Sequence, residues 1–272
     1  MQQIPRAFRG RNSSGALPQE PSGSVVPPEE RPPSCLSLSG RQPGGTAAYL
    51  LSSQPKDIPL TAPALNSALT DVTPYITAWE YERPNAVPIV GKRLGIAYLR
   101  ENPYDRDSFG VLWSSCGLAR GQGRPDYGRV HPQRQRQCMG GLLCQRCAGP
   151  ADENEQGVLW LLDAEPGSPS PAEGEVTAHP PVCRGCAAEA IRRCPPLRRG
   201  HALIRVKEPE VSGVHGMLYR PTRLSTYAVA TGRKEFIPYT DPMVRWVLAG
   251  QLYARLFDIT PATHDELIRE AA

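Results

Sequence analysis

Two Cys-x-x-Cys pairs constrain what this chain can fold into more than any other feature of its sequence. Cys144 and Cys147 form the first pair, and Cys183 and Cys186 form the second. Because each short turn points two thiolates at one cation, two such pairs are typical of a tetrahedral four-cysteine Zn²⁺ site. Four thiolates leave no position for water, so the pattern predicts a structural zinc ion.

Other interpretations of the cysteines stay open. Scattered structural thiols would need no metal, and a redox pair would need only one motif, in a βαβ context that the sequence does not show. Disulfides would need a secreted protein, which we do not expect because Ser, Gly and Pro, not an apolar stretch, follow the first arginines. Four further residues could replace a predicted ligand, although buried thiols and loop histidines explain them as well: Cys138, Cys194, His179 and His201.

The 35 residues between the two pairs exceed the roughly 15 to 20 of a common zinc ribbon. A loop over residues 165–175 accounts for part of the excess, and doubling a loop's length costs only about 0.6 kcal/mol. The remainder predicts a β-hairpin with strands over 158–162 and 176–182. Good helix formers follow over 187–193. The predicted order is therefore a cysteine knuckle, a hairpin, and a second pair at the start of a helix.

That order resembles a treble-clef zinc module over residues 142–196, a class that includes the HNH-type nucleases. Such a nuclease carries an Asp-His or His-His pair for its catalytic metal. Here the interval holds a single histidine, His179, and its one asparagine, Asn154, lies far upstream. A zinc deaminase would need an upstream His/Cys-x-Glu motif, which is also missing. We therefore expect no enzyme, and an HNH-type nuclease or a derivative of one is the less favoured alternative.

Over residues 75–257 the motif order also resembles that of a group of uncharacterised actinobacterial proteins with paired Cys-x-x-Cys motifs. The resemblance rests on two Gly-Val-Leu-Trp stretches (110–113 and 157–160), the basic segment before Cys144, and Asp241-Pro242. It implies a cytoplasmic bacterial protein and gives no residue a catalytic role. We interpret the two Gly-Val-Leu-Trp stretches as buried aromatic strands rather than as a repeat.

The predicted fold class is α+β, a small mixed domain of short strands organised around the zinc module. Residues 1–71 hold 11 Pro, 10 Ser and 6 Gly. Such a segment cannot offset about 1 to 2 kcal/mol of backbone entropy per residue, so it predicts a disordered tail. A true start of translation near Val72 is the alternative. Three segments follow: a short-strand region with a basic stretch (72–137), the zinc module (138–200), and strands with C-terminal helices (201–272).

The C-terminal segment alternates between strand and helix patterns. It predicts a strand over 202–206, a glycine-bounded hairpin within 211–219 and a strand over 227–230. Asp241-Pro242 is a helix-start signal, and it predicts an amphipathic helix over 243–257. The apolar face of that helix would carry Val244, Val247, Leu248, Leu252 and Leu256.

The charge distribution narrows the choice of partner. The net charge is +4, and no apolar run approaches the roughly 18 residues of a membrane span, so we expect no membrane partner. Arginines on both sides of the cysteine pairs favour a zinc-stabilised protein that binds nucleic acid or acts as a regulator. The alternative is a protein-interaction module with an acidic partner. The candidate nucleic-acid-binding residues are Arg129, Arg134, Arg136, Arg184, Arg192, Arg193, Arg198 and Arg199.

Overall fold

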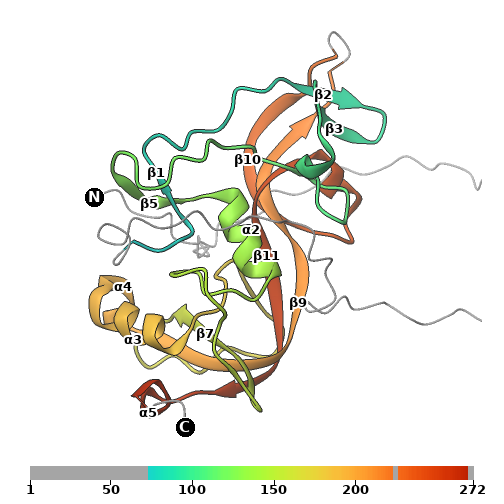
Figure 1. Ribbon diagram of the computed structural model, residues 1–272. Helices are drawn as coiled ribbons and strands as arrows, with labels where there is room; N and C mark the ends of the chain where they lie inside the picture. Colours follow the sequence, from blue (N-terminus) through green and yellow to red (C-terminus); the bar gives the residue numbers. More distant parts are fainter. Residues whose placement is uncertain (1–72, 223–225, 269–272) are drawn as a thin grey trace, which may run out of the picture. The chain divides into compact units, whose positions relative to one another are not determined.

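The centre of the fold is a mostly antiparallel sheet built on long strands, in which β4 alone pairs in parallel among the described strands (Figure 1). The computed structural model describes residues 73–222 and 226–268, so the predicted tail over 1–71 lies outside the described residues. Strand β9 (His201–Arg220) pairs along one edge with β11 (Val247–Pro261) and along the other with β7 (Gly157–Asp163) and β10 (Val229–Pro238). Three short strands complete this sheet: β4 (Leu112–Trp113) and β8 (Glu175–Thr177) on β11, and β6 (Glu153–Asn154) on β7.

Helix α2 (Pro132–Gly140) packs against the sheet. Met139 joins the main core with Trp160 and Leu256, all three of them fully buried. The buried Gln135 side chain donates to the Leu252 carbonyl oxygen and accepts from the Leu252 N–H, each at 2.8 Å. Gln135 thus supplies the hydrogen bonds that a neighbouring strand would otherwise give to β11 at this point.

The remaining described strands form two small two-stranded sheets. The first joins β1 (Thr77–Trp79) to β5 (Pro125–Val130), and the second is the hairpin of β2 (Ile89–Lys92) and β3 (Gly95–Tyr98). The remaining helical segments are short: η2 (Pro103–Asp105), α3 (Arg184–Arg193), α4 (Pro195–Arg199), η3 (Pro242–Trp246) and α5 (His264–Ile268).

The structure confirms the α+β class and the early strands. Strands β2 and β3 lie within the predicted short-strand region, and β4 and β7 lie at the two Gly-Val-Leu-Trp stretches. Both Gly-Val-Leu-Trp stretches place a tryptophan in the same core, Trp113 and Trp160, as expected of buried strands. The segment boundary at 137/138 falls inside α2, and the main core draws on residues of all three described segments.

The predicted C-terminal amphipathic helix over 243–257 is wrong. Asp241 does cap a helical start, because its Oδ1 accepts the Met243 N–H at 2.8 Å. The helix ends at Trp246 as the 3₁₀ segment η3, and β11 begins at the next residue. The register of β11 on β9 shifts between Ala249 and Gln251, and such an irregularity lets an alternating strand pattern look like a helical one.

Both hairpins predicted around the sheet are also wrong. Residues 211–219 run straight through β9, and a Cβ at Gly216 would collide with the Leu248 carbonyl oxygen. Glycine marks a close approach of two strands there, not a turn. The segment 158–162 lies in β7, which pairs with β6 and β9, whereas β8 pairs with β11. Local alternation identifies a strand but not its partner.

Candidate metal centre

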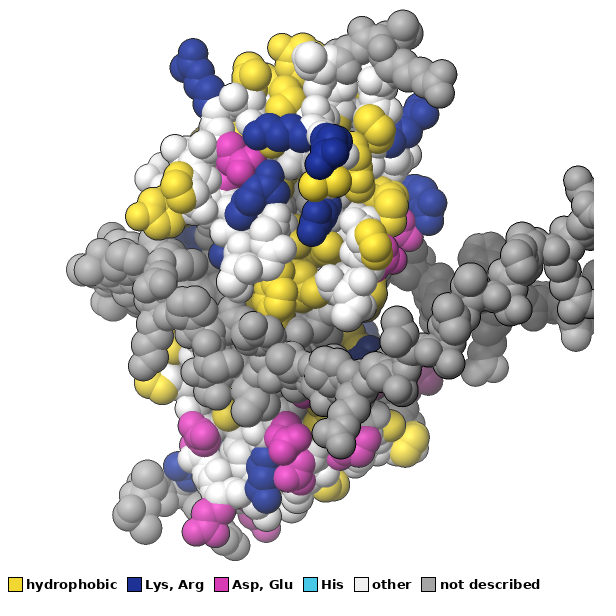
Figure 2. Space-filling model, turned by 90° about the vertical axis from the view of Figure 1, so that its right-hand side faces the viewer, with side chains coloured by type: hydrophobic (Ala, Val, Ile, Leu, Met, Phe, Trp, Pro, Cys, Tyr) yellow, Lys and Arg dark blue, Asp and Glu magenta, His cyan; other side chains and the backbone are white. Residues whose placement is uncertain are grey.

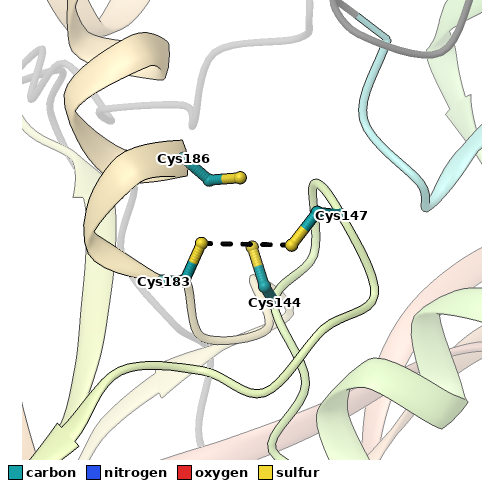
Figure 3. A group of neighbouring side chains, drawn as sticks. All are labelled: Cys144, Cys147, Cys183 and Cys186. Atoms are coloured by element: carbon teal, nitrogen blue, oxygen red, sulfur yellow. Dashed lines mark hydrogen bonds between the residues drawn. The ribbon is translucent and has the colours of Figure 1, made fainter. Parts of the chain in front are cut away.

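The structure brings the four predicted cysteines together (Figure 3). The sulfur atoms of Cys144, Cys147, Cys183 and Cys186 all lie within 4.8 Å of one another. The Cys147 and Cys183 sulfurs are 3.9 Å apart. Four ligands at a Zn–S distance of about 2.3 Å place tetrahedral sulfurs roughly 3.8 Å apart, so this spacing suits a bound ion. The four cysteines are close enough to hold a metal ion.

The first pair lies on a tight loop held by its own backbone. The Cys144 N–H donates to the Gly149 carbonyl at 2.7 Å, and the Ala148 N–H donates to the Cys144 carbonyl at 2.8 Å. Ala148 has a φ of 62°, in the left-handed region that non-glycine residues rarely adopt. This reversal turns Cys144 and Cys147 toward the same point.

The second pair lies at the N-terminus of α3. Cys183 is the residue before the helix, and Cys186 lies in its first turn. Unpaired N–H groups and the helix dipole favour thiolates at this end. The knuckle is bonded to the chain that leads into α3, since the Gln145 N–H donates to the Pro181 carbonyl at 2.9 Å. The helix predicted over 187–193 is confirmed and begins earlier, at Arg184.

The thiols perturb one another as a crowded cluster should. Hydrogen bonds from the Cys183 and Cys186 side chains lower the pKa of Cys144. The neighbouring Cys144 in turn raises the pKa of Cys183 to about 11 and also raises the pKa of Cys186. One thiolate therefore forms readily at the expense of the others. A cation bound between the sulfurs would offset the repulsion among four thiolates and release their protons.

None of the four alternative ligands joins the cluster. Cys138 is fully buried, its sulfur faces the Cys144 carbonyl at 3.7 Å, and burial raises its pKa, as expected of a small buried residue. Cys194 ends α3. His179 lies beside Asp163, with 3.7 Å between Nε2 and Oδ1. His201 contacts the Leu197 carbonyl through Nδ1 and His264 through Nε2.

An ion-pair network beside the centre was missed by the sequence analysis. The Asp152 carboxylate, which follows the knuckle, accepts from Arg184 Nε at 2.7 Å and from Arg205 Nη2 at 2.6 Å. Arg205 is only 2% exposed and also reaches Glu266 of α5 at 3.3 Å. The network links α3, β9 and α5 around the loop. Its one visible signal in the sequence is an arginine inside the apolar run 202–206.

Four of the eight candidate arginines make contacts within the protein, and one of them, Arg134, is buried, which removes it from the predicted arginine face. Arg134 is buried, and two of its nitrogens lie 2.6 Å from the Glu82 carboxylate. Arg129 pairs with Asp126 at 2.7 Å, and Arg136 lies over the Trp113 ring at 5.0 Å. Arg184 belongs to the network described above. Arginine can satisfy several buried acceptors at once, so a basic sequence segment need not be a basic surface.

The other four candidate arginines are exposed. Arg192 and Arg193 lie in the last turn of α3, and Arg198 and Arg199 lie in α4. Glu189 pairs with both Arg192 and Arg193, which reduces their net positive charge. These four are the exposed members of the predicted set, whereas Arg129, Arg136 and Arg184 are half-buried.

Comparisons with models of protein families, with curated proteins and with solved structures found no match. Across residues 73–222 and 226–268, no helix has both the length and the apolar character to cross a membrane. Function is therefore inferred from the cysteine centre and the surface alone.

Proposed function

We propose that this chain is a non-enzymatic, zinc-stabilised protein of the cytoplasm that binds nucleic acid. The observation that carries the proposal is a closed four-sulfur cluster at the base of α3, whose outer end and successor α4 carry four exposed arginines. A tetrahedral set of four thiolates favours Zn²⁺ or an iron–sulfur centre. Zinc is the better fit, because sulfurs within 4.8 Å of one another suit a single ion rather than a cluster of several ions. The closed set favours a structural role over a catalytic one.

The surroundings of the sulfurs support this structural role. Cys144 and Cys186 belong to a small core with Leu159, Val182 and Leu203. The sequence of knuckle, β6–β7 strand pair and α3 supports a treble-clef-like module, in which the ion fixes the knuckle to the helix. The exposed arginines of α3 and α4 are the groups on this module that suit phosphate oxygens.

Metal analysis tests the zinc part of the proposal. The purified protein should contain about one zinc per chain, and Cys183→Ser should lose most of it together with a large part of its thermal stability. Structural zinc contributes on the order of 10 to 16 kcal/mol of apparent binding energy, comparable with the stability of a whole domain. Cys194→Ser is the matched control, because Cys194 lies outside the cluster. Full zinc retention by Cys183→Ser, with an unchanged melting temperature, would remove Cys183 from the site.

Equilibrium binding tests the nucleic-acid part. Fluorescence anisotropy of labelled DNA and RNA should show binding at about 50 mM salt and a steep loss of affinity as salt rises, because bound phosphates release counterions. An affinity that does not change with salt, or no binding to either nucleic acid at low salt, would contradict this part and favour an acidic protein partner.

A further inference from the structure

A second cationic surface lies away from the cysteine centre. Two segments, residues 88–100 and the described residues of 217–234 (217–222 and 226–234), contain six Lys or Arg and no Asp or Glu, and Arg245 of η3 adds a seventh cation. The fold joins these two segments, because Val90 pairs with Tyr227 and the Gly91 N–H donates to the Thr226 carbonyl at 2.8 Å. We call this surface the basic end, and its described, exposed cations are Lys92, Arg93, Arg100, Arg220, Arg233, Lys234 and Arg245.

The hairpin of β2 and β3 is fixed against η3. Arg93 and Leu94 form its turn, and Gly95 follows with a φ of 150°. A Cβ at Gly95 would collide with the Arg245 carbonyl oxygen, so the turn lies directly on η3. This packing brings Lys92, Arg93 and Arg245 to one place although about 150 residues of chain separate the hairpin from η3.

The cations of the basic end have few acidic neighbours. In the described ranges 73–222 and 226–268, Arg233 is the one member of the set that pairs with a carboxylate, that of Glu235 at 3.0 Å. By comparison, Glu189 lies between Arg192 and Arg193 on α3. Glu101, whose charge interacts with that of Lys92, and Glu235 offset part of the positive charge, but the seven cations outnumber these two carboxylates. Such an excess of positive charge suits a surface that meets a polyanion.

Hydrophobic side chains are interleaved with these cations. Leu94, on the hairpin turn, is 58% exposed and Tyr227 is 50% exposed; Leu99, Val229 and Met243 are exposed as well. Strands β2, β3 and β10 lie at the top of Figure 1, and the upper part of Figure 2 shows Lys and Arg among hydrophobic side chains. Asp and Glu side chains are also in view there, and they predominate among the charged side chains of the lower part of the same face.

This mixture selects among polyanions. A duplex presents its phosphates outward and keeps its base faces stacked, so it would leave the exposed apolar side chains without a partner. A membrane surface would favour apolar side chains gathered on one insertion face with cations around them. An unpaired strand offers phosphates and base faces side by side, and base faces stack on aromatic rings.

We propose that the basic end binds single-stranded nucleic acid, with its lysines and arginines on the phosphates and with Leu94, Tyr227 and Met243 against the bases. This inference rests on the proposed nucleic-acid binding. It adds the basic end to the exposed arginines of α3 and α4 as a second contact surface, and it names the form of the ligand. Tyr227 is the stacking residue, and the hairpin turn supplies two phosphate contacts from Lys92 and Arg93.

The test uses the full chain and labelled 20-nucleotide single strands of DNA and RNA, with the matching duplexes as competitors. Lys92→Ala with Arg93→Ala should weaken single-strand binding about tenfold or more, and should reduce the slope of log K against log salt by about 1.4, since each single-strand phosphate contact contributes about 0.7. Tyr227→Ala should weaken it by about 5- to 150-fold, the range for one stacked base, and Tyr227→Phe should restore it. Lys207→Ala with Arg255→Ala is the matched control, because both are exposed cations outside the basic end.

Each other outcome is decisive. If wild type binds but the hairpin variant keeps its affinity and slope while Arg192→Ala with Arg193→Ala loses them, the contact lies on α3 and the inference fails. Tighter binding to duplex than to single strands also overturns it. If wild type binds neither nucleic acid, the proposed function fails and the inference with it.

Vesicles containing phosphatidylserine serve as a further probe. If the protein binds these vesicles and does not bind oligonucleotides, the basic end is a site for anionic lipid. Equal zinc content and melting temperature in each variant show that the fold is intact.

Discussion

At the scale of single residues, Arg134 shows how far a basic segment can differ from a basic surface. Its guanidinium holds the buried Glu82 carboxylate and also donates to the Tyr75 and Thr77 carbonyls, at 2.6 and 2.8 Å. Burial alone would raise the pKa of Glu82, but the hydrogen bonds and charge of Arg134 outweigh it, and the pKa lies below its ordinary value of 4.5. Glu82 therefore stabilises the fold above its unfolded pKa, and this contribution is lost as pH falls through the lower folded pKa.

We expect Arg134→Ala to lower the free energy of unfolding by about 3 to 5 kcal/mol, because it leaves the Glu82 carboxylate buried without a partner. Urea denaturation at pH 7 measures this loss. Arg124→Ala, at an exposed position, should change stability by no more than about 0.5 kcal/mol. The deficit of Arg134→Ala should shrink as pH falls through the folded pKa of Glu82, because protonation removes the charge that Arg134 compensates. Equal stability of the two variants at pH 7 would contradict the buried ion pair.

At the scale of elements, β11 differs most from its prediction, because residues predicted to form a helix form a strand. Leu252, Ala254 and Leu256 are buried, while Tyr253 and Arg255 between them are more exposed, which is a strand period of two. In a helix, Arg255 would lie on the apolar face with Leu248 and Leu252, and Ala254 would lie at the edge of that face. In the structure Ala254 is fully buried in the main core.

Ala254→Asp should therefore destabilise the protein by several kcal/mol, because an unpaired carboxylate would enter the core. Arg255→Asp, one residue later and on the exposed side, should be tolerated. Thermal and urea unfolding of the two variants compare the faces directly. Tolerance of Ala254→Asp, or a larger loss of stability at Arg255→Asp than at Ala254→Asp, would contradict the strand assignment.

The elements also show what a single sequence can predict. The cysteine cluster follows from spacing, because each Cys-x-x-Cys turn is local and a helix begins at the second pair. Strands such as β7 follow from short apolar runs. The pairing of β7 with β9 and of β8 with β11 depends on contacts across dozens of residues, which alternation does not encode. Whether an arginine is buried or exposed depends on carbonyls and carboxylates that are distant in sequence and close only in the fold, as Glu82 is to Arg134.

At the scale of the whole molecule, the described residues build two principal cores of different composition. The larger core holds most buried residues of β9, β10 and β11, and no cysteine. The smaller core contains Cys144 and Cys186 and is completed by α3, α4 and α5 through residues such as Ile191, Leu197 and Leu267. A metal ion at the cluster would thus support the smaller core directly. It would support the larger core only through β7 and β9, which contribute side chains to both cores.

Metal removal should accordingly loosen one part of the protein before the other. If the proposed zinc ion is stripped with a chelator, amides of the knuckle and of α3 should exchange with deuterium much faster, because regions with few remaining apolar contacts open locally. Amides in the paired stretch of β9 and β11 around Val214 and Leu252 should stay protected, since both side chains lie in the larger core. Hydrogen exchange read by mass spectrometry distinguishes the two regions in one experiment. Simultaneous loss of protection in both would mean that the metal centre holds the entire sheet together, and unchanged exchange in α3 would mean that the cysteines stabilise the helix without an ion.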